Sequence, residues 1–291
     1  MISGVLSVGW LILRGRRGRW SMTAAPLFRQ AVPLLVLYAI WLRLGEEHPI
    51  GPSQAADRAR WIWHVEKWLP FPSELTLQRW TLHATWLVRF ANGYYIAAHV
   101  VPMGIFLVWL YVRHPDRVPR WRNQLGFLSI VGAIIQFLPV APPRLMPEFG
   151  FIDTAARFGP RVYDSSGFKQ AGQLAAMPSM HIGWAVLIAF ATFSASRSRW
   201  RWIGPAHALL TFFAVTVTAY HWLLDSLVAV LILLIGLGIA AVFRRVVRRK
   251  RCPVSATSGR SNQVDRGPYI DRTPSTSPSI RRPVDVKPWR S

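Results

Sequence analysis

The sequence predicts an all-α integral membrane protein: a helical bundle of about six transmembrane helices with an amphipathic helix at the membrane interface. Three observations predict it. Hydrophobic residues make up 52% of the 291 residues and charged residues only 16%, whereas a typical soluble domain has about 25% charged residues. Long apolar stretches recur along the chain. Basic residues gather in alternate connections between those stretches.

The apolar stretches lie approximately at 31–45, 94–113, 124–140, 182–196, 202–220 and 222–243. A helix needs about 17–25 residues to cross a bilayer, so we expect the two shortest stretches to include flanking residues. This pattern predicts three regions: a basic cytoplasmic N-terminus over 1–30, a membrane catalytic domain over 31–243, and a basic cytoplasmic tail over 244–291. The tail is rich in Pro, Ser and Arg, a composition typical of disorder.

The distribution of charge predicts the orientation. The net charge is +22, and most basic residues lie before the first span, between spans two and three, between spans four and five, and after span six. Under the positive-inside rule, both termini are cytoplasmic and the connections 44–93, 141–181 and 220–222 face outside. We therefore expect a multi-pass protein of the cell membrane, and the placement of the charge argues against nucleic acid as a partner. The single cysteine, Cys252, excludes a cysteine-based metal site within one chain.

Residues 46–93 have the composition of an interfacial segment. Trp, Leu and Ile recur about every three or four residues with charged residues between them, which is typical of helices lying in the membrane interface. Glu66 and Glu74 in this segment are expected to be surface charges. The first twenty residues lack the order of a signal peptide, because the basic cluster follows the apolar run. Met22 is therefore an alternative start to Met1.

Three polar clusters interrupt the apolar pattern, and the predicted orientation brings all three to the outer face. They are "FLPVAPPRLMPE" with Arg144, "MPSMHIGW" with Ser179 and His181, and "TAYHWLLDSLVAV" with His221 and Asp225. In a helix, residues four apart share a face, so Asp225 is expected to orient the His221 ring and leave its other nitrogen available. The alternative for this pair is a structural contact between helices.

The second cluster is typical of a helix start. Pro178 suits a first helical turn and Ser179 suits an N-cap, and the free amides of that turn form an anion site. The alternative for this cluster is an ordinary helix cap beside a histidine at the membrane interface. The alternative for Arg144 is that its side chain extends, or snorkels, to the membrane surface. Taken together, an anion site, an arginine, two histidines and a carboxylate are the parts needed for phosphoryl transfer through a histidine.

The segments "APPRLMP", "MPSMHIGW" and "YHWLLD" resemble the phosphatidic acid phosphatase type 2 (PAP2) superfamily. They are most similar to its inositolphosphotransferase branch, which includes the fungal inositol phosphorylceramide synthases, and the similarity covers roughly 60–243. The resemblance implies that His221 forms a phosphohistidine, Asp225 orients it and His181 moves protons. It further implies that Arg144 and Ser179 bind phosphate and that no metal or other cofactor is needed.

The resemblance also implies a transferase or hydrolase of lipid metabolism, acting on a phospholipid or prenyl phosphate at the extracytoplasmic face. Tyr95 and His99 are expected on one face of span two, as a possible substrate pocket or as interhelical hydrogen-bonding groups. The chain departs from the broad phosphatase pattern at Phe137 and Val215, where that pattern has a lysine and an arginine. This departure favours the transferase branch. The acceptor, whether water, inositol or another alcohol, is left open.

Two other classes of protein fit part of the pattern. Two histidines and a carboxylate also suit a metal-dependent membrane hydrolase. A transporter or other lipid-binding membrane protein without catalysis would use the same polar residues for headgroups, although transporters place broken helices near the middle of the membrane.

Overall fold

The computed structural model describes residues 32, 36, 51–70, 72–159 and 173–251. The chain divides into two units, 1–247 and 248–291, and the description below concerns the first. The predicted N-terminal region, nearly all of the predicted first span at 31–45 and the tail beyond residue 251 lie outside the described residues.

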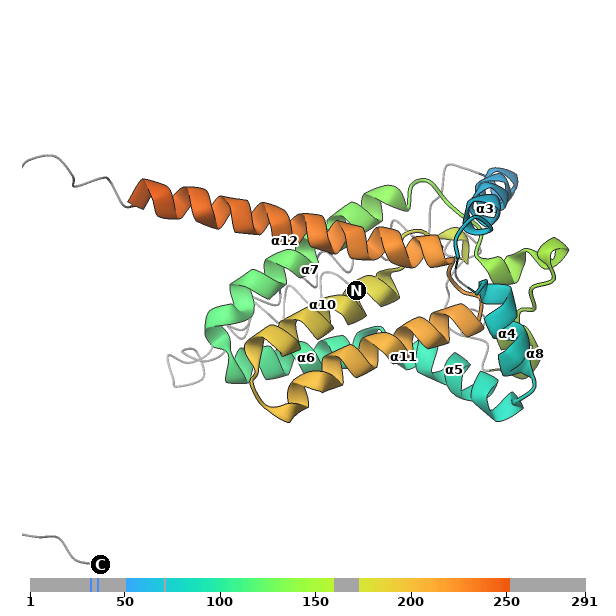
Figure 1. The fold of residues 1–291 in the computed structure, drawn as a ribbon, viewed down its shortest axis with the longest axis horizontal. Coiled ribbons are helices and arrows are strands. Elements are labelled where there is room, and N and C mark those ends of the chain that lie inside the picture. Colours follow the sequence, from blue (N-terminus) through green and yellow to red (C-terminus); the bar gives the residue numbers. More distant parts are fainter. Residues whose placement is uncertain (1–31, 33–35, 37–50, 71, 160–172, 252–291) are drawn as a thin grey trace, which may run out of the picture. The chain divides into compact units, whose positions relative to one another are not determined.

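The described part of the chain is helical, as predicted (Figure 1). Its α-helices are α3 (Pro52–Glu66), α4 (Glu74–Leu82), α5 (Thr85–Ala97), α6 (Val100–Arg113), α7 (Val118–Ile135), α8 (Thr154–Phe158), α10 (Met180–Ala195), α11 (Ile203–Val217) and α12 (Leu223–Arg251). Short 3-10 helices are η1 (Pro115–Arg117), η2 (Pro143–Leu145), η3 (Pro147–Phe149) and η5 (Arg199–Trp202). Among the described residues the extended structure is limited to an isolated parallel bridge between Val140 and Ala175.

Among these helices, one is long and apolar enough to cross a membrane by itself, over Leu223–Val247 of α12. Helices α5 and α6 meet that test only as a pair bent by 51°, so the predicted span 94–113 is broken at Ala98 and His99. Helix α10 is apolar but has only 16 residues. The count of six spans therefore stays a prediction.

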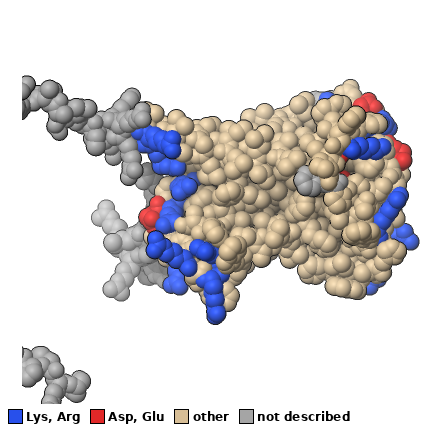
Figure 2. Space-filling model, viewed as in Figure 1, with Lys and Arg blue, Asp and Glu red and all other residues tan. Residues whose placement is uncertain are grey.

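Charged side chains gather at two opposite ends of the first unit (Figure 2). The uncharged surface between these ends is rich in exposed apolar side chains, among them Ile105, Val108, Leu209 and Leu231. A bilayer provides the environment in which such a surface is stable, because apolar side chains there avoid water.

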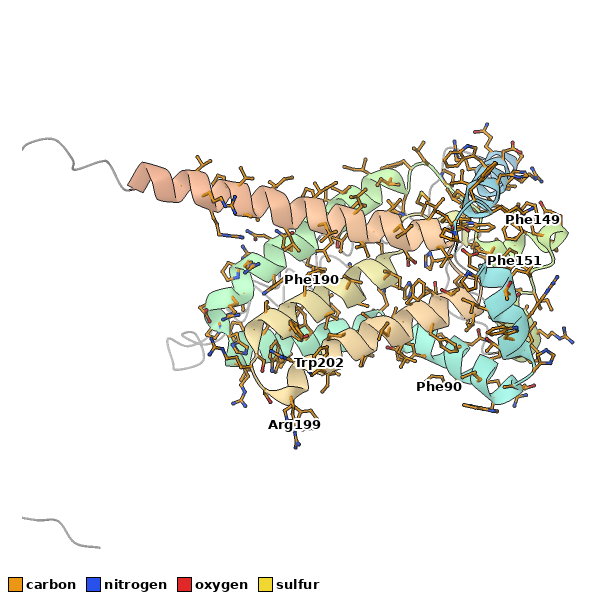
Figure 3. All side chains as sticks on the ribbon, in the orientation of Figure 1. Phe90, Phe149, Phe151, Phe190, Arg199 and Trp202 are labelled. Carbon is orange, nitrogen blue, oxygen red and sulfur yellow. The ribbon has the colours of Figure 1, made fainter. Side chains whose placement is uncertain are left out.

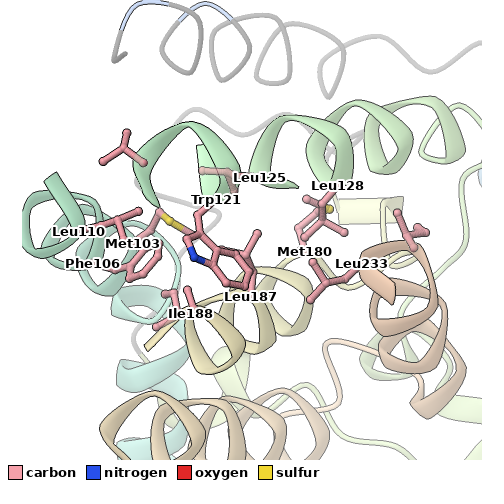
Figure 4. Close-up of a cluster of buried hydrophobic side chains, with 13 residues drawn as sticks. Met103, Phe106, Leu110, Trp121, Leu125, Leu128, Met180, Leu187, Ile188 and Leu233 are labelled. Atoms are coloured by element: carbon pink, nitrogen blue, oxygen red, sulfur yellow. The ribbon is translucent and has the colours of Figure 1, made fainter. Parts of the chain in front are cut away.

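The largest apolar core lies between α6, α7, α10 and α12 (Figure 4). Trp121 and Leu128 of α7 and Leu187 of α10 are almost fully buried within it. Met180, at the start of α10, joins the same cluster. The packing therefore anchors the end of α10 that carries His181.

Helices α10 and α11 pack closely at Gly204. A Cβ atom built on Gly204 would lie 2.9 Å from the Ala189 Cα atom and 3.1 Å from the Ile188 carbonyl oxygen. Only a residue without a side chain allows this approach of two backbones.

We expect Gly204→Ala to destabilise the protein by about 1–3 kcal/mol, because backbone atoms must move to admit the methyl group. Thermal unfolding in detergent would measure it. Gly126→Ala is the matched control, since a Cβ there meets nothing within 4 Å. Equal melting temperatures for the two variants would contradict the close approach.

The segment before α5 forms two helices, α3 and α4, near the end at which α12 begins (Figure 1). The Ala141 amide donates to the Ala55 carbonyl oxygen at 3.1 Å, and Gln78 exchanges two hydrogen bonds with the backbone of Ile152 at 2.9 and 3.0 Å. Trp63 of α3 stacks on Phe149 at 5.0 Å and lies 6.1 Å from Trp222. The cluster that includes Phe149 and Phe151 lies at the opposite end of the helices from Arg199 and Trp202 (Figure 3).

Candidate active site

The three polar clusters predicted from sequence meet at one end of the bundle. The Arg144 amide donates to the Ala219 carbonyl oxygen at 2.9 Å, and the Ser179 amide donates to the Asp225 carbonyl oxygen at 3.1 Å. His221 Nδ1 lies 2.7 Å from the Ala176 carbonyl oxygen. These contacts join the connection after α7, the start of α10 and the turn between α11 and α12 into one site.

The turn that carries His221 begins at a left-handed residue. Ala219 has φ of 57°, and its amide donates to Thr216 O while the Tyr220 amide donates to Val215 O. This pair of bonds is the Schellman arrangement that ends many helices, in which glycine usually takes the left-handed position. An alanine there costs about 1–2 kcal/mol, so the surrounding contacts hold this turn in a strained conformation.

His221 lies in that turn, two residues before α12 begins, and not on the helix as the spacing had predicted. The pair with Asp225 still forms, since His221 Nδ1 lies 3.5 Å from Asp225 Oδ2. The closer neighbour of Nδ1 is the Ala176 carbonyl oxygen, so a backbone acceptor holds the ring. His221 Nε2 is buried and has no hydrogen-bond partner among the described residues.

Asp225 Oδ2 accepts a hydrogen bond from the Trp222 amide at 2.8 Å, and the residue is fully buried. The carboxylate therefore closes the turn that holds His221 and also lies beside its ring. Sequence spacing predicted the second role but not the first.

His181 faces His221, with ring centroids 5.7 Å apart. Its ring stacks on Tyr95 at 4.2 Å and lies 4.5 Å from the His99 ring. Tyr95 also stacks on Tyr220, with ring centroids 4.0 Å apart. Tyr95 and His99 flank the bend between α5 and α6 instead of sharing one helix face, yet both contact His181.

Ser179 is the N-cap of α10, as predicted, and its Oγ accepts from the Ile182 amide at 3.4 Å. Pro178 precedes the cap and so is not in the first turn, contrary to our expectation. Ser179 is fully buried. Its hydroxyl is thus part of the helix cap that places His181.

Arg144 is buried, with 3% of its side chain exposed. Its guanidinium donates to Asp153 Oδ2 at 2.8 Å and lies over the Tyr220 ring at 4.8 Å. Tyr220 thus links Arg144 to the stacked rings of Tyr95 and His181. Asp153 itself caps α8 by accepting from the amides of Ala155 and Ala156, which fixes the carboxylate that holds the arginine.

Glu66 and Glu74 are not surface charges, contrary to our expectation. Both are buried. Glu74 Oε1 accepts from the Leu223 amide at 2.6 Å and Glu66 Oε1 from the Leu224 amide at 2.7 Å. Sequence spacing carries no signal for this contact, because more than 140 residues separate the partners.

Burial, with the charge of Glu74 as the second cause, raises the pKa of Glu66 to about 9, and burial also raises the pKa of Glu74.

This pKa shift predicts how stability depends on pH. Folded Glu66 keeps its proton up to about pH 9, whereas the unfolded chain loses it near pH 4.5. The folded state then binds more protons, so the stability that this group contributes falls as pH rises between those values. In detergent, the melting temperature of Glu66→Gln minus that of the wild type should rise from pH 5 to pH 9. Parallel curves would contradict this.

The two positions that depart from the broad phosphatase pattern carry apolar side chains. Val215 is buried beside Tyr95 and Tyr220 in a small apolar cluster. Phe137 is 41% exposed just after the end of α7. Neither side chain can bind a phosphate oxygen.

Within the described ranges, no three His, Cys, Asp or Glu side chains are grouped so that they could hold a metal ion. The site is made of His181, His221, Arg144 and the start of α10. Nε2 of His221 has no hydrogen-bond partner among the described residues. Fold and site thus define an all-helical protein with a paired-histidine centre at one end of its bundle.

A sequence model described as the PAP2 superfamily matches residues 60–239, which is more than half of the chain. The protein belongs to the PAP2 superfamily. This superfamily generally comprises phosphatases and phosphotransferases. Searches among curated proteins and among solved structures gave no match.

Proposed function

We propose that this protein transfers or hydrolyses a lipid phosphate ester at the extracytoplasmic face of the membrane, through a phosphohistidine on His221. The observation that carries the proposal is the state of the His221 ring. Its Nδ1 is held by the Ala176 carbonyl oxygen and lies beside Asp225. Its Nε2 has no partner in the described part of the chain, and the centroid of its ring lies 5.7 Å from that of the His181 ring.

The first step uses the free nitrogen of His221. The Nε2 lone pair attacks phosphorus while the bond from phosphorus to the ester oxygen breaks, and protonated His181 gives its proton to the leaving oxygen. In the second step the oxygen of water or an alcohol attacks phosphorus, His181 takes the proton, and the phosphorus–nitrogen bond breaks. One histidine thus serves as nucleophile and the other as general acid and then general base.

Arg144 is proposed to bind the oxygens of the phosphate, because a guanidinium provides several fixed donors. Its stack on Tyr220, the neighbour of His221 in sequence, supports this role. The amides at the start of α10, where Ser179 is the cap, would add a favourable helix terminus for an anion.

An apolar groove of about 650 Å³ supports a lipid as the substrate. It is lined by side chains of α10, α11 and α12 and of the segment near α4. Ile182, which follows His181, and Leu223, two residues after His221, both line it. An acyl or prenyl chain in this groove would place its phosphate beside the histidines, and burial of apolar area would supply the binding free energy.

Membership of the inositolphosphotransferase branch is part of the proposal. It rests on the motifs with Arg144, His181 and His221 and on the absence of the two phosphatase-type basic residues at Phe137 and Val215. An alcohol such as inositol is then the expected acceptor.

The deciding experiment incubates purified protein with labelled phospholipids and prenyl phosphates, with and without inositol, and identifies the products. A phosphorylated alcohol would support a transferase, and free phosphate a phosphatase. Turnover that is lost in excess chelator would favour a metal-dependent hydrolase. Lipid binding without any product would favour a transporter or a non-enzymatic lipid-binding protein.

The orientation gives a separate prediction. In a Cys252→Ser background, Glu148→Cys should react with a membrane-impermeant thiol reagent in intact cells, whereas Arg199→Cys should react only after lysis. Both side chains are exposed, so accessibility in water is not the difference. Phe149, the residue after Glu148, lies at the opposite end of the helices from Arg199 (Figure 3). Labelling in the reverse order would place the histidines on the cytoplasmic side.

A further inference from the structure

Three successive backbone amides directly after His221 each donate to a carboxylate. The Trp222 amide donates to Asp225 Oδ2 at 2.8 Å. The next two amides, those of Leu223 and Leu224, donate to Glu74 at 2.6 Å and Glu66 at 2.7 Å. Glu66 is the last residue of α3 and Glu74 the first of α4. Two other helices therefore hold the turn that carries His221.

This arrangement exceeds what a helix start needs. The first four amides of a helix lack intrahelical partners; one polar side chain at the N-cap commonly satisfies one of them, and water can satisfy the others. Here two further carboxylates are buried at the same turn, although burying an unpaired charge is costly. A local side chain such as serine would have capped the helix without that cost.

The two glutamates cannot both be ionised in this environment. Neither forms an ion pair with a described residue, and the two carboxyl groups lie within hydrogen-bonding reach of one another. Asp225 is the titratable group that faces them from another element. Two carboxyl groups that share a buried site retain one proton between them.

We propose that Glu66 and Glu74 are positioning residues for phosphotransfer, and that the proton they share keeps the turn Trp222–Asp225 in the geometry that orients His221. The inference rests on the proposed function of His221. Neither glutamate touches the substrate, and both act through the backbone of the turn.

Loss of the proton has a defined consequence. Two ionised carboxylates beside Asp225 repel one another, and one of them must leave its amide. The turn then shifts, and Asp225 moves away from His221 Nδ1, which lies only 3.5 Å from it. The pKa of Glu66, raised by burial to about 9, sets the pH at which this begins.

The test compares Glu66→Gln with the wild type. The glutamine keeps the acceptor oxygen for the Leu224 amide and donates an N–H to Glu74, so it imitates the protonated pair at every pH. The kcat of the variant should equal that of the wild type at pH 7 within about threefold. Relative to the wild type it should rise about tenfold by pH 10, as the wild-type pair loses its proton. Effects from His181 and from the substrate cancel in this ratio.

Glu66→Ala removes both the acceptor and the proton. We expect its kcat to fall about 10²-fold with little change in KM, because a misplaced reacting group slows chemistry more than binding. Glu148→Gln, an exposed carboxylate paired with Arg60, is the control and should match the wild type. Wild-type kcat in Glu66→Ala, or a constant ratio for Glu66→Gln from pH 7 to pH 10, would overturn the inference.

Infrared spectroscopy tests the proton without catalysis. The wild type should show a carbonyl band of a protonated carboxyl group that disappears between pH 7 and pH 10. This change should be absent in Glu66→Gln and retained in His221→Ala. If the band is present but the protein turns over no lipid, the proposed function is wrong and the shared proton is not contradicted. If turnover depends on His221 but the band is missing and the kcat ratio is constant, the shared proton is wrong and the proposed function is not contradicted.

Discussion

His221→Ala is expected to abolish both product formation and the trapped phosphoenzyme. The reason is that Nε2 of this ring is the proposed nucleophile and has no hydrogen-bond partner among the described residues. Brief reaction with radiolabelled lipid phosphate, alkaline quenching and an acid-lability assay would detect the phosphohistidine.

His181→Ala should behave differently. If this residue only moves protons, turnover falls about 10²–10⁴-fold, while acid-labile label still forms on His221. The loss should be smaller for substrates with better leaving groups, because these need less protonation. Asp225→Asn should fall between the two variants, since it keeps an acceptor for the Trp222 amide but removes the charge beside His221.

The matched control is His83→Ala, because His83 is exposed. It should retain full turnover and label. Label retained in His221→Ala and lost in His181→Ala would reverse the two roles. No label in any variant, together with loss of turnover in chelator, would support the metal-dependent alternative.

Arg144→Lys is expected to lower kcat/KM about 10²–10³-fold, the usual cost of losing one well-placed donor to a developing charge. Lysine keeps the positive charge but lacks the planar fork. It therefore cannot keep its bond to Asp153 and its stack on Tyr220 while also donating to phosphate.

Binding of a phosphate analogue separates this loss from a folding defect. Vanadate should raise the melting temperature of the wild type but not that of Arg144→Lys. Arg60→Lys is the control, because Arg60 forms an exposed pair with Asp57 and such pairs contribute little. Full activity and full vanadate stabilisation in Arg144→Lys would exclude Arg144 as a phosphate ligand.

Much of the candidate site was predictable from local sequence. The helical class followed from the apolar stretches, and the Ser179 cap followed from a serine before an apolar helix, because capping depends on residues a few positions apart. The motifs of Arg144, His181 and His221 were visible because polar residues are rare in apolar sequence. Hydrogen bonds join Arg144 to Ala219 and His221 to Ala176, so these motifs lie together at one end of the bundle. That this end faces outside the cell stays a prediction.

The sequence by itself thus determined the helical class and which polar side chains gather, since both depend on composition and short spacing. Only the tertiary structure decided what holds them. The bend beside His99 brings Tyr95 and His99 to the same histidine, and the Ala176 carbonyl orients His221. Glu66 and Glu74 leave no periodic signal, because they bind backbone amides that every residue type carries, on a helix that begins about 150 residues later.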